Sequence, residues 1–329
     1  MWEAVEDGTS TQKPSALVLS SRWTKEKPGW ASETFRGCQT RAIMNLGKAF
    51  QALWRGNAKY PTFHKKGRKD SFYVDNGHAY ISGNRIHLPN IGKVRLAEPL
   101  RFNGKIIGYT VSGYAGQWHV SVQVDTQDAM RPCLAPDSVV GIDIGLNHIA
   151  VASDGTICDT PKSLKRLHKK LKDRQRALAR TRSRSNNHRK LLKKKQKVQL
   201  RIDNIRQDVA HKFTSRITKS HGIVVVEDLD LKGMMDKAQY KSMRRSLTSS
   251  MMGTILQQLS YKSLQLKKAD RSFPSTKTCS SCGSKKDSIG LNERVYSCEH
   301  CGAVLDRDLN AALNLMKLGM VNPDCEKQQ

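Results

Sequence analysis

The chain has few acidic residues for its number of basic ones: 29 Asp and Glu stand against 57 Lys and Arg, and the formal net charge is +28. Such a charge opposes compaction unless a polyanion neutralises it. Nucleic acid, an anionic membrane or an acidic protein could do so. No apolar run approaches the ~18–20 residues that span a membrane, and the start lacks a secretory apolar segment. We therefore expect nucleic acid as the partner and no membrane.

The chain also lacks the cysteine pattern of a small secreted protein. Four of its eight cysteines are scattered singly. The others form two Cys-x2-Cys pairs separated by 15 residues: Cys279, Cys282, Cys298 and Cys301. This spacing predicts a zinc site, because each pair directs two sulfurs at one point. Four thiolates leave no open coordination position, so the predicted zinc is structural, and reduced thiols indicate the cytoplasm.

Three acidic residues stand in unusual places. Asp143 lies in the apolar strand "VVGIDIG", Glu227 ends "GIVVVE", and Asp308 begins the last helix. Acids are depleted in strands and rarely buried without a partner. Each one alone is compatible with a salt bridge or a cap. Together, in a basic chain without an HExxH or HxH pattern, they favour a Mg²⁺ site for phosphodiester cleavage, since Mg²⁺ prefers carboxylate ligands.

The spacing of apolar residues predicts the helices and strands around these acids and cysteines. Helical spacing predicts a helix over 32–55. Short alternating strands with Gly and Asn turns predict a small β-barrel over 72–125, with Trp118 in its core. Apolar residues that recur at helical spacing over a long stretch predict an antiparallel helical pair over 162–210.

The helical pair is strongly basic. Residues 162–201 carry 18 Lys and Arg and a single acid, Asp173. A solvated face usually mixes charges of both signs, so this composition favours contact with an RNA or DNA backbone. Three aromatic residues in or beside the basic connector after residue 57 could stack on bases or pack in the core: Tyr60, Phe63 and Phe72.

Several segments in order resemble one family. "GIDIG", "VVVEDLDLKGM" and "DRDLNAALN", with the cysteine region between the second and third, are similar to the split RuvC nuclease of TnpB (OrfB) proteins. These are transposon-encoded RNA-guided DNA endonucleases related to type V CRISPR effectors. "FPSTKTCSSCG" and "YPTFHKKGRKDSF" are also similar to that family. The resemblance covers roughly residues 40–318.

The resemblance implies an α+β multidomain protein with an RNase H-like (RuvC) nuclease. A partial helical recognition segment would occupy 1–56, a β-barrel wedge-like domain 57–136, and the nuclease 137–329. The helical hairpin 162–210 and the zinc ribbon 275–304 would be inserted in the nuclease. Asp143, Glu227 and Asp308 would be the catalytic Mg²⁺ ligands, Asp306 would support them, and guide RNA and target DNA would be the partners.

Two departures from the family pattern bear on activity. The family usually begins several dozen residues earlier, so the chain is expected to be N-terminally truncated. The stretch 261–273 is shorter and more polar than the family's apolar strand, so the nuclease sheet is expected to lack a well-made final strand. An RNA-guided DNA-binding protein with little or no cleavage is therefore the alternative. An RNA-independent structure-specific nuclease fits the basic helices and the β region poorly, and no Tyr or His constellation suggests a transposase.

Overall fold

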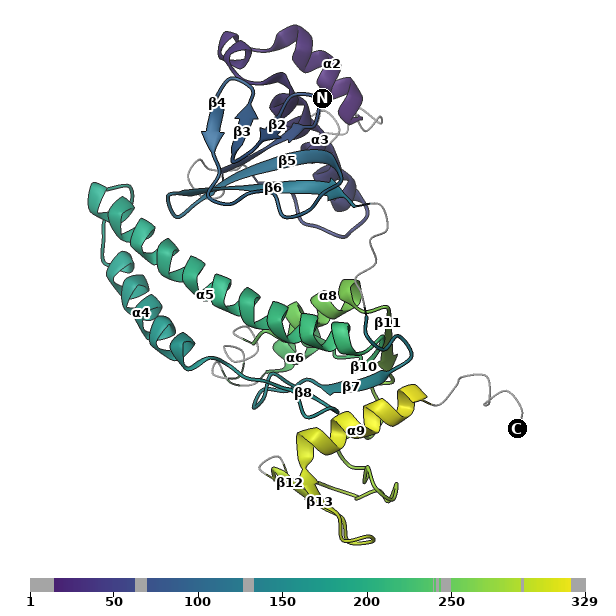
Figure 1. Ribbon diagram of the computed structural model, residues 1–329. Helices are drawn as coiled ribbons and strands as arrows, with labels where there is room; N and C mark the ends of the chain where they lie inside the picture. The colour runs from purple at the N-terminus through teal and green to yellow at the C-terminus, as the bar shows by residue number, and fades with distance from the viewer. Residues whose placement is uncertain are drawn as a thin grey trace. The chain divides into compact units, whose positions relative to one another are not determined.

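The computed structural model describes residues 15–62, 70–126, 133–238, 240, 243, 250–290 and 293–320. The chain divides into two compact units, Met1–Ala129 and Met130–Gln329 (Figure 1). Each unit has its own hydrophobic core. Within the described ranges, no helix combines the length and the apolar character needed to cross a membrane.

The first unit begins with helices. Helix α2 spans Ala16–Glu26, a 3-10 turn η1 spans Gly29–Glu33, and α3 spans Arg36–Trp54. The helix predicted at 32–55 is thus confirmed, although it begins four residues later because η1 occupies the preceding turn. Gly56 follows α3 with a φ of +72°, a left-handed conformation that ends the helix at little cost.

The strands of the first unit form two antiparallel sheets. One has the order β1-β5-β6 and the other β2-β3-β4. Their bounds are Asp70–Asp75 (β1), Tyr80–Ser82 (β2), Arg85–Leu88 (β3), Gly92–Arg95 (β4), Lys105–Tyr114 (β5) and Gln117–Asp125 (β6). The prediction of a closed barrel is wrong for the described strands, since neither sheet bonds to the other. Strands β2 to β4 are only three or four residues long, and the two sheets instead share one core around Tyr109 and Ile86.

Trp118 was predicted in the core of this unit, and that prediction is also wrong. The side chain is 66% exposed. Its cross-strand partner is Gly113, and the indole ring lies 2.9 Å from the position that a Cβ on Gly113 would occupy. Because the glycine has no side chain, the ring covers backbone at the end of the hairpin instead of entering the core.

The second unit contains a mixed sheet (Figure 1), whose five strands have the order β11-β10-β7-β8-β9. Strands β7, β10 and β11 are parallel to one another, whereas β8 and β9 are antiparallel to their neighbours. The bounds are Val139–Asp143 (β7), Ala150–Ala152 (β8), Ile157–Cys158 (β9), Ile223–Glu227 (β10) and Gln265–Ala269 (β11). The apolar strands predicted around residues 143 and 227 are therefore confirmed, and they are immediate neighbours.

Strand β11 contradicts the expectation that the final strand is poorly made. All five of its residues pair in parallel with β10. Its polar residues are compatible with an edge position, where charged side chains face away from the sheet. Lys268 Nζ donates to Asp228 Oδ1 at 3.1 Å, and Lys267 Nζ donates to the carbonyl of Gly319 at 3.1 Å.

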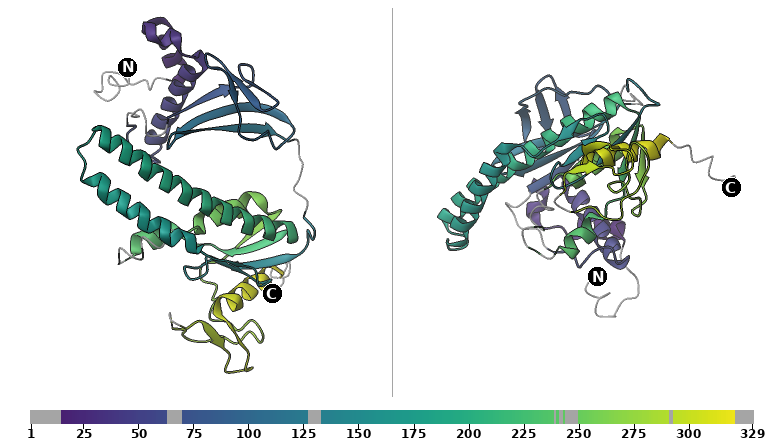
Figure 2. Two further views of the ribbon diagram at one scale, coloured as in Figure 1. Left: turned by 60° about the vertical axis from the view of Figure 1, so that its left-hand side comes forward. Right: turned by 90° about the horizontal axis from the view of Figure 1, so that it is seen from below.

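Helices cover both faces of this sheet (Figures 1 and 2). Helices α5 (Asn186–Ser220) and α8 (Met252–Lys262) pack on the face that carries Val140, Ile142, Val224 and Val226. Helix α9 (Arg307–Met320) packs on the opposite face, where Leu315 contacts Val139 and Val225. Because strand side chains alternate between faces, the next odd-numbered residues, Asp143 and Glu227, belong to the α9 face.

The basic helical pair is confirmed. Helix α4 spans Lys162–Ala179, and it packs along the first half of α5 through an apolar seam formed by Leu164, Leu171, Val198 and Ile202. Helix α5 continues ten residues beyond the predicted end at 210, because Phe213 and Ile217 belong to the core of the sheet. The hairpin is therefore joined to the five-stranded sheet by a single continuous helix.

Gly141 allows α9 to lie directly on β7. A Cβ at Gly141 would lie 2.0 Å from the carbonyl oxygen of Ala312 and 2.4 Å from the amide nitrogen of Met316, both in the α9 backbone. We expect Gly141→Ala to lower the free energy of unfolding by ~2–3 kcal/mol, because the helix must shift. Chemical denaturation measures this. Gly253→Ala is the matched control: its Cβ meets only Leu231 Cδ1 at 3.5 Å, so stability should be unchanged or slightly higher. Equal effects of the two substitutions would contradict this account of Gly141.

Candidate metal sites and relatives

The structure brings the four predicted cysteine ligands together. Their sulfur atoms all lie within 4.8 Å of one another. The Sγ atoms of Cys279 and Cys301 are 3.7 Å apart, and those of Cys282 and Cys298 are 3.6 Å apart. Four sulfurs at this spacing can hold a single metal ion such as zinc.

Each cysteine pair is held in the same kind of turn. In the first, the Cys279 amide donates to the carbonyl of Ser284 at 2.8 Å, and the Gly283 amide donates to the carbonyl of Cys279 at 3.0 Å. In the second, the Cys298 amide donates to the carbonyl of Ala303 at 2.8 Å, and the Gly302 amide donates to the carbonyl of Cys298 at 2.9 Å. Gly283 and Gly302 have φ values of +78° and +71°, which glycine adopts readily. The repeated turn explains why the spacing within each pair is two residues.

The cysteine turns favour the thiolate form at Cys279 and Cys298, whereas hydrogen bonds shared with the neighbouring thiols raise the pKa of Cys301. Burial opposes ionisation of Cys279, but hydrogen bonds to its sulfur from the backbone of Cys282 and Ser281 and from the neighbouring thiols lower its pKa to about 6. A metal requires the deprotonated sulfur, so this environment assists metal binding at neutral pH.

The three predicted acidic ligands lie at one end of the sheet in the second unit. Asp143 is the last residue of β7 and Glu227 is the last residue of β10, and the preceding residues Ile142 and Val226 are paired partners. Asp308 lies in the first turn of α9, which packs on the face to which both strand acids belong. Residues separated by up to 165 positions in the sequence are therefore neighbours in the fold.

The three acids act on one another through their charges. Asp143 is only 9% exposed. Burial, followed by the negative charges of Glu227 and Asp308, raises the pKa of Asp143 to about 7, while the positive charge of Arg307 opposes the increase. The acids are less tightly grouped than the cysteines: among the described residues, only the cysteines have three or more ligand atoms within 4.8 Å of one another. Neighbouring like charges, of which Asp143 and Asp308 are buried and Glu227 is half-buried, favour a bound cation.

Asp306 has a different position from the other acids. Its Oδ1 accepts hydrogen bonds from the amides of Asp308 at 2.9 Å and Leu309 at 3.0 Å, so it caps the start of α9. The predicted supporting role of Asp306 at a metal site stays a prediction, and the structure shows this residue as the cap of α9. By ordering the first turn of α9, it fixes the position of Asp308.

Two residues beside the acids were not predicted. Arg307 contacts Asp308 Oδ1 through NH2 at 3.3 Å, and its side chain is only 17% exposed. Ser275 is buried, and its hydroxyl donates to Glu227 Oε1. Arg307 lies next to a predicted ligand in the sequence and could have been suspected from that. Ser275 could not, because only the fold brings it to Glu227.

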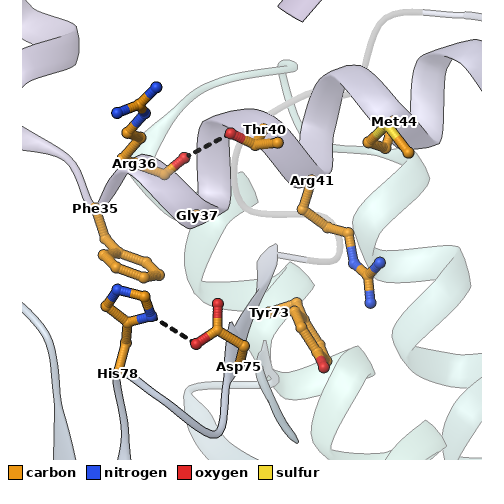
Figure 3. A pocket seen from close by; sticks show the side chains of 9 residues that line it. All are labelled: Phe35, Arg36, Gly37, Thr40, Arg41, Met44, Tyr73, Asp75 and His78. Carbon is orange, nitrogen blue, oxygen red and sulfur yellow. Dashed lines mark hydrogen bonds and ion pairs between the residues drawn. The ribbon is translucent and has the colours of Figure 1, made fainter. Parts of the chain in front are cut away.

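The first unit has a groove between α3 and β1, with a volume of about 360 Å³ (Figure 3). On one side the ring of Phe35 lies against His78, with 5.0 Å between centroids, and His78 Nδ1 lies 2.5 Å from Asp75 Oδ1. On the other side the Arg41 guanidinium lies 4.1 Å from the centre of the Tyr73 ring. Aromatic rings and a guanidinium plane are groups on which bases and phosphates bind.

The three aromatic residues considered for base stacking differ in their surroundings. Phe72 packs against the core of the first unit. Tyr60 is 51% exposed and meets Phe50 edge to face, with 5.6 Å between ring centroids. Phe63 lies outside the described residues.

Known families match most of the second unit. Residues 119–238 match the OrfB_IS605 family, described as "Probable transposase", and residues 253–315 match the TNB domain of Cas12f1-like proteins. A solved structure titled "Cryo-EM structure of the Cas12f1-sgRNA-target DNA complex" superposes with a TM-score of 0.54 at 16% identity, covering 98% of this chain and 78% of the other. That likeness shows a shared mixed α/β multidomain fold.

Relatives match nearly the full chain. A Streptomyces pristinaespiralis protein named "Putative RNA-guided DNA endonuclease" is 30% identical over 335 residues, covering 98% of this chain and 81% of the relative. The Escherichia coli K12 protein "Putative RNA-guided DNA endonuclease InsQ" is 29% identical over 319 residues, covering 92% and 77%. The resemblance found in the motifs is thereby confirmed, and the chain belongs to the TnpB (OrfB) family.

Proposed function

We propose that this protein is an RNA-guided DNA endonuclease whose active site consists of Asp143, Glu227 and Asp308. The observation that carries the proposal is the convergence of these acids. Two parallel strands and one helix place them at one end of a sheet, and the pKa of Asp143 responds first to burial and then to both other acids. Membership of the TnpB family and the names of the relatives support the same activity.

The donor set fits Mg²⁺. Carboxylate oxygens are the ligands this ion prefers, and the raised pKa of Asp143 marks a place where a cation would relieve the repulsion between acids. Divalent cations held by such acids activate water and stabilise the leaving oxygen in phosphodiester hydrolysis. Within this chain, Asp306 orders the helix that carries Asp308, and Arg307 supplies positive charge beside it.

The remaining regions are assigned around this site. We assign 137–329 to the RuvC-like nuclease, with the hairpin 162–210 and a zinc ribbon 275–304 inserted, 57–136 to a wedge-like domain, and 1–56 to a recognition segment. The basic hairpin and the groove of Figure 3 offer cationic and aromatic contacts for guide RNA and target DNA. Thiol ligands for zinc fit a reducing cytoplasm.

The deciding experiment is programmed cleavage. The protein is expressed with the RNA encoded beside its gene, the co-purifying RNA is sequenced, and a plasmid carrying a matching target is incubated with Mg²⁺. We expect cutting that depends on the match and disappears in Glu227→Gln and Asp308→Asn. Asp137→Asn, which changes an exposed acid of the same unit, should cut normally.

Other outcomes separate the alternatives. Guided binding without cutting would identify an RNA-guided DNA-binding protein. Cutting that persists without RNA would identify a structure-specific nuclease. Full activity of Glu227→Gln or Asp308→Asn would refute the proposed active site.

A further inference from the structure

Ser275 makes a contact that the active-site residues alone do not explain. The side chain belongs to the segment between β11 and the first cysteine pair, and it is only 2% exposed. Its hydroxyl donates a hydrogen bond to Glu227 Oε1. A glutamate has three rotatable side-chain bonds, so a buried donor on one oxygen restricts the directions in which the other oxygen can point.

The turn that carries Ser275 is closed by its own hydrogen bonds. The amides of Lys277 and Thr278 both donate to the carbonyl of Pro274 at 3.1 Å, and Thr278 Oγ1 donates to the same carbonyl at 2.9 Å. Cys279, the first metal-site cysteine, follows immediately. Ser275 is therefore separated from the cysteine site by a single tight turn.

Two buried asparagines of α9 fix this turn in place. Asn314 Nδ2 donates to the carbonyls of Ser275 and Thr278, each at 2.7 Å. Asn310 Nδ2 donates to the Thr278 carbonyl at 2.7 Å, and its Oδ1 accepts from the Ser280 amide at 2.8 Å. Both asparagines are at most 5% exposed. They lie one helical turn apart on the helix that also carries Asp308, so one rigid element orients two of the three acids.

We infer that Ser275 is a positioning residue for Glu227, and that the clamp formed by Asn310 and Asn314 holds it there. The inference rests on the proposed function, because it assigns a role to Ser275 through a proposed metal ligand. A group that orients a metal ligand by hydrogen bonding typically changes metal affinity by ~10–100-fold when it is removed. Ser275 acts on metal binding through Glu227 and does not itself touch the cation.

The test measures metal binding directly and does not depend on cleavage. Mn²⁺, as a probe for Mg²⁺, is titrated into the full-length protein with its cysteine site loaded with zinc. We expect Ser275→Ala to weaken Mn²⁺ binding ~10-fold relative to the natural protein. Ser272→Ala is the matched control: Ser272 is an exposed serine three residues earlier whose hydroxyl bonds Asp270 instead. It should leave Mn²⁺ binding unchanged.

A double-mutant cycle shows whether Ser275 acts through Glu227. In a Glu227→Gln background, adding Ser275→Ala should weaken Mn²⁺ binding by less than ~2-fold, because the oriented ligand is already lost. Equal losses in both backgrounds, or none from Ser275→Ala alone, would overturn the inference. If Asp143→Asn binds Mn²⁺ as well as the natural protein does, the proposed acidic site itself fails, and this outcome is distinct from a failure of Ser275.

Discussion

Asp143→Asn is expected to abolish cleavage and, at the same time, to make the protein more stable in buffer without divalent cations. Asp143 is buried at the end of β7. Burial in the first place, and then the charges of Glu227 and Asp308, raises the pKa of its carboxyl from the usual 3.8 to about 7. The folded protein therefore disfavours the ionised form, and asparagine keeps the shape of the side chain without its charge.

The sign of the pH dependence follows from this shift. An acid whose pKa is raised by folding lowers the free energy of unfolding wherever it would be ionised in the unfolded chain. This loss of stability is absent well below the unfolded pKa of 3.8, grows as the pH rises, and is complete above about 7. A shift of this size corresponds to at most ~4 kcal/mol. We expect Asp143→Asn to recover roughly 1–3 kcal/mol at pH 8, about a quarter of that at pH 4.5, and almost nothing near pH 3.

Thermal unfolding and cleavage assays measure the two effects. The unfolding midpoint at pH 8 should rise by roughly 3–6 °C for a unit of this size, while the cleavage rate should fall by at least ~10²–10³-fold. Adding Mg²⁺ should stabilise the natural protein but not the variant, since the cation neutralises the charge that asparagine lacks. A variant that is less stable at pH 8, or that still cuts, would contradict the role given to Asp143.

The positions of the three acids that form the proposed site could be predicted from sequence because their physical signal is local. A carboxylate in a run such as "GIVVVE" or "VVGIDIG" is costly unless something compensates for it, and that cost is visible without a structure. The third acid belongs to a helix whose start is also visible in the sequence. Strand alternation then places Asp143 and Glu227 on one face of the sheet.

The supporting contacts could not be predicted because they depend on how distant segments pack. Ser275 lies in "FPSTKTCSSCG", and Asn310 and Asn314 lie in "DRDLNAALN", but the likeness of these segments to the family does not give the three side chains their partners. Only the position of α9 against the turn at 274–278 gives them partners. The errors in the first unit have a similar origin: alternation in the sequence identifies strands, but not whether two sheets close into a barrel or whether Trp118 covers a glycine.

Cys298→Ser is expected to remove the metal from the cysteine site and to unfold the ribbon around it. The ribbon has a very small core, in which Tyr296 packs with Cys279 and Cys298 and with the partly buried Ile289 and Ala303. A segment with so little apolar burial depends on its metal, and tetrathiolate zinc sites supply ~10–16 kcal/mol. The purified natural protein should contain about one zinc ion per chain, and the variant almost none.

Hydrogen exchange shows how far the damage extends. In Cys298→Ser, the backbone amides of residues 279–304 should exchange faster than in the natural protein. The amides of the first unit should exchange at the same rate in both. Cys38→Ser, which changes a lone thiol in that unit, is the matched control and should alter neither zinc content nor protection. A ribbon that stays protected without zinc would show that its small core suffices.

The same variant should weaken the acidic site, although Cys298 touches none of its ligands. Cys279 loses its metal and no longer anchors the end of the turn that carries Ser275, so the Asn310 and Asn314 contacts must hold that turn alone. Mn²⁺ affinity should therefore fall in the same direction as in Ser275→Ala, by ~3–10-fold if the turn loosens only in part. Suppose that Mn²⁺ affinity falls in Ser275→Ala but is unchanged in Cys298→Ser. The contacts of Asn310 and Asn314 would then position Glu227 without help from the cysteine site.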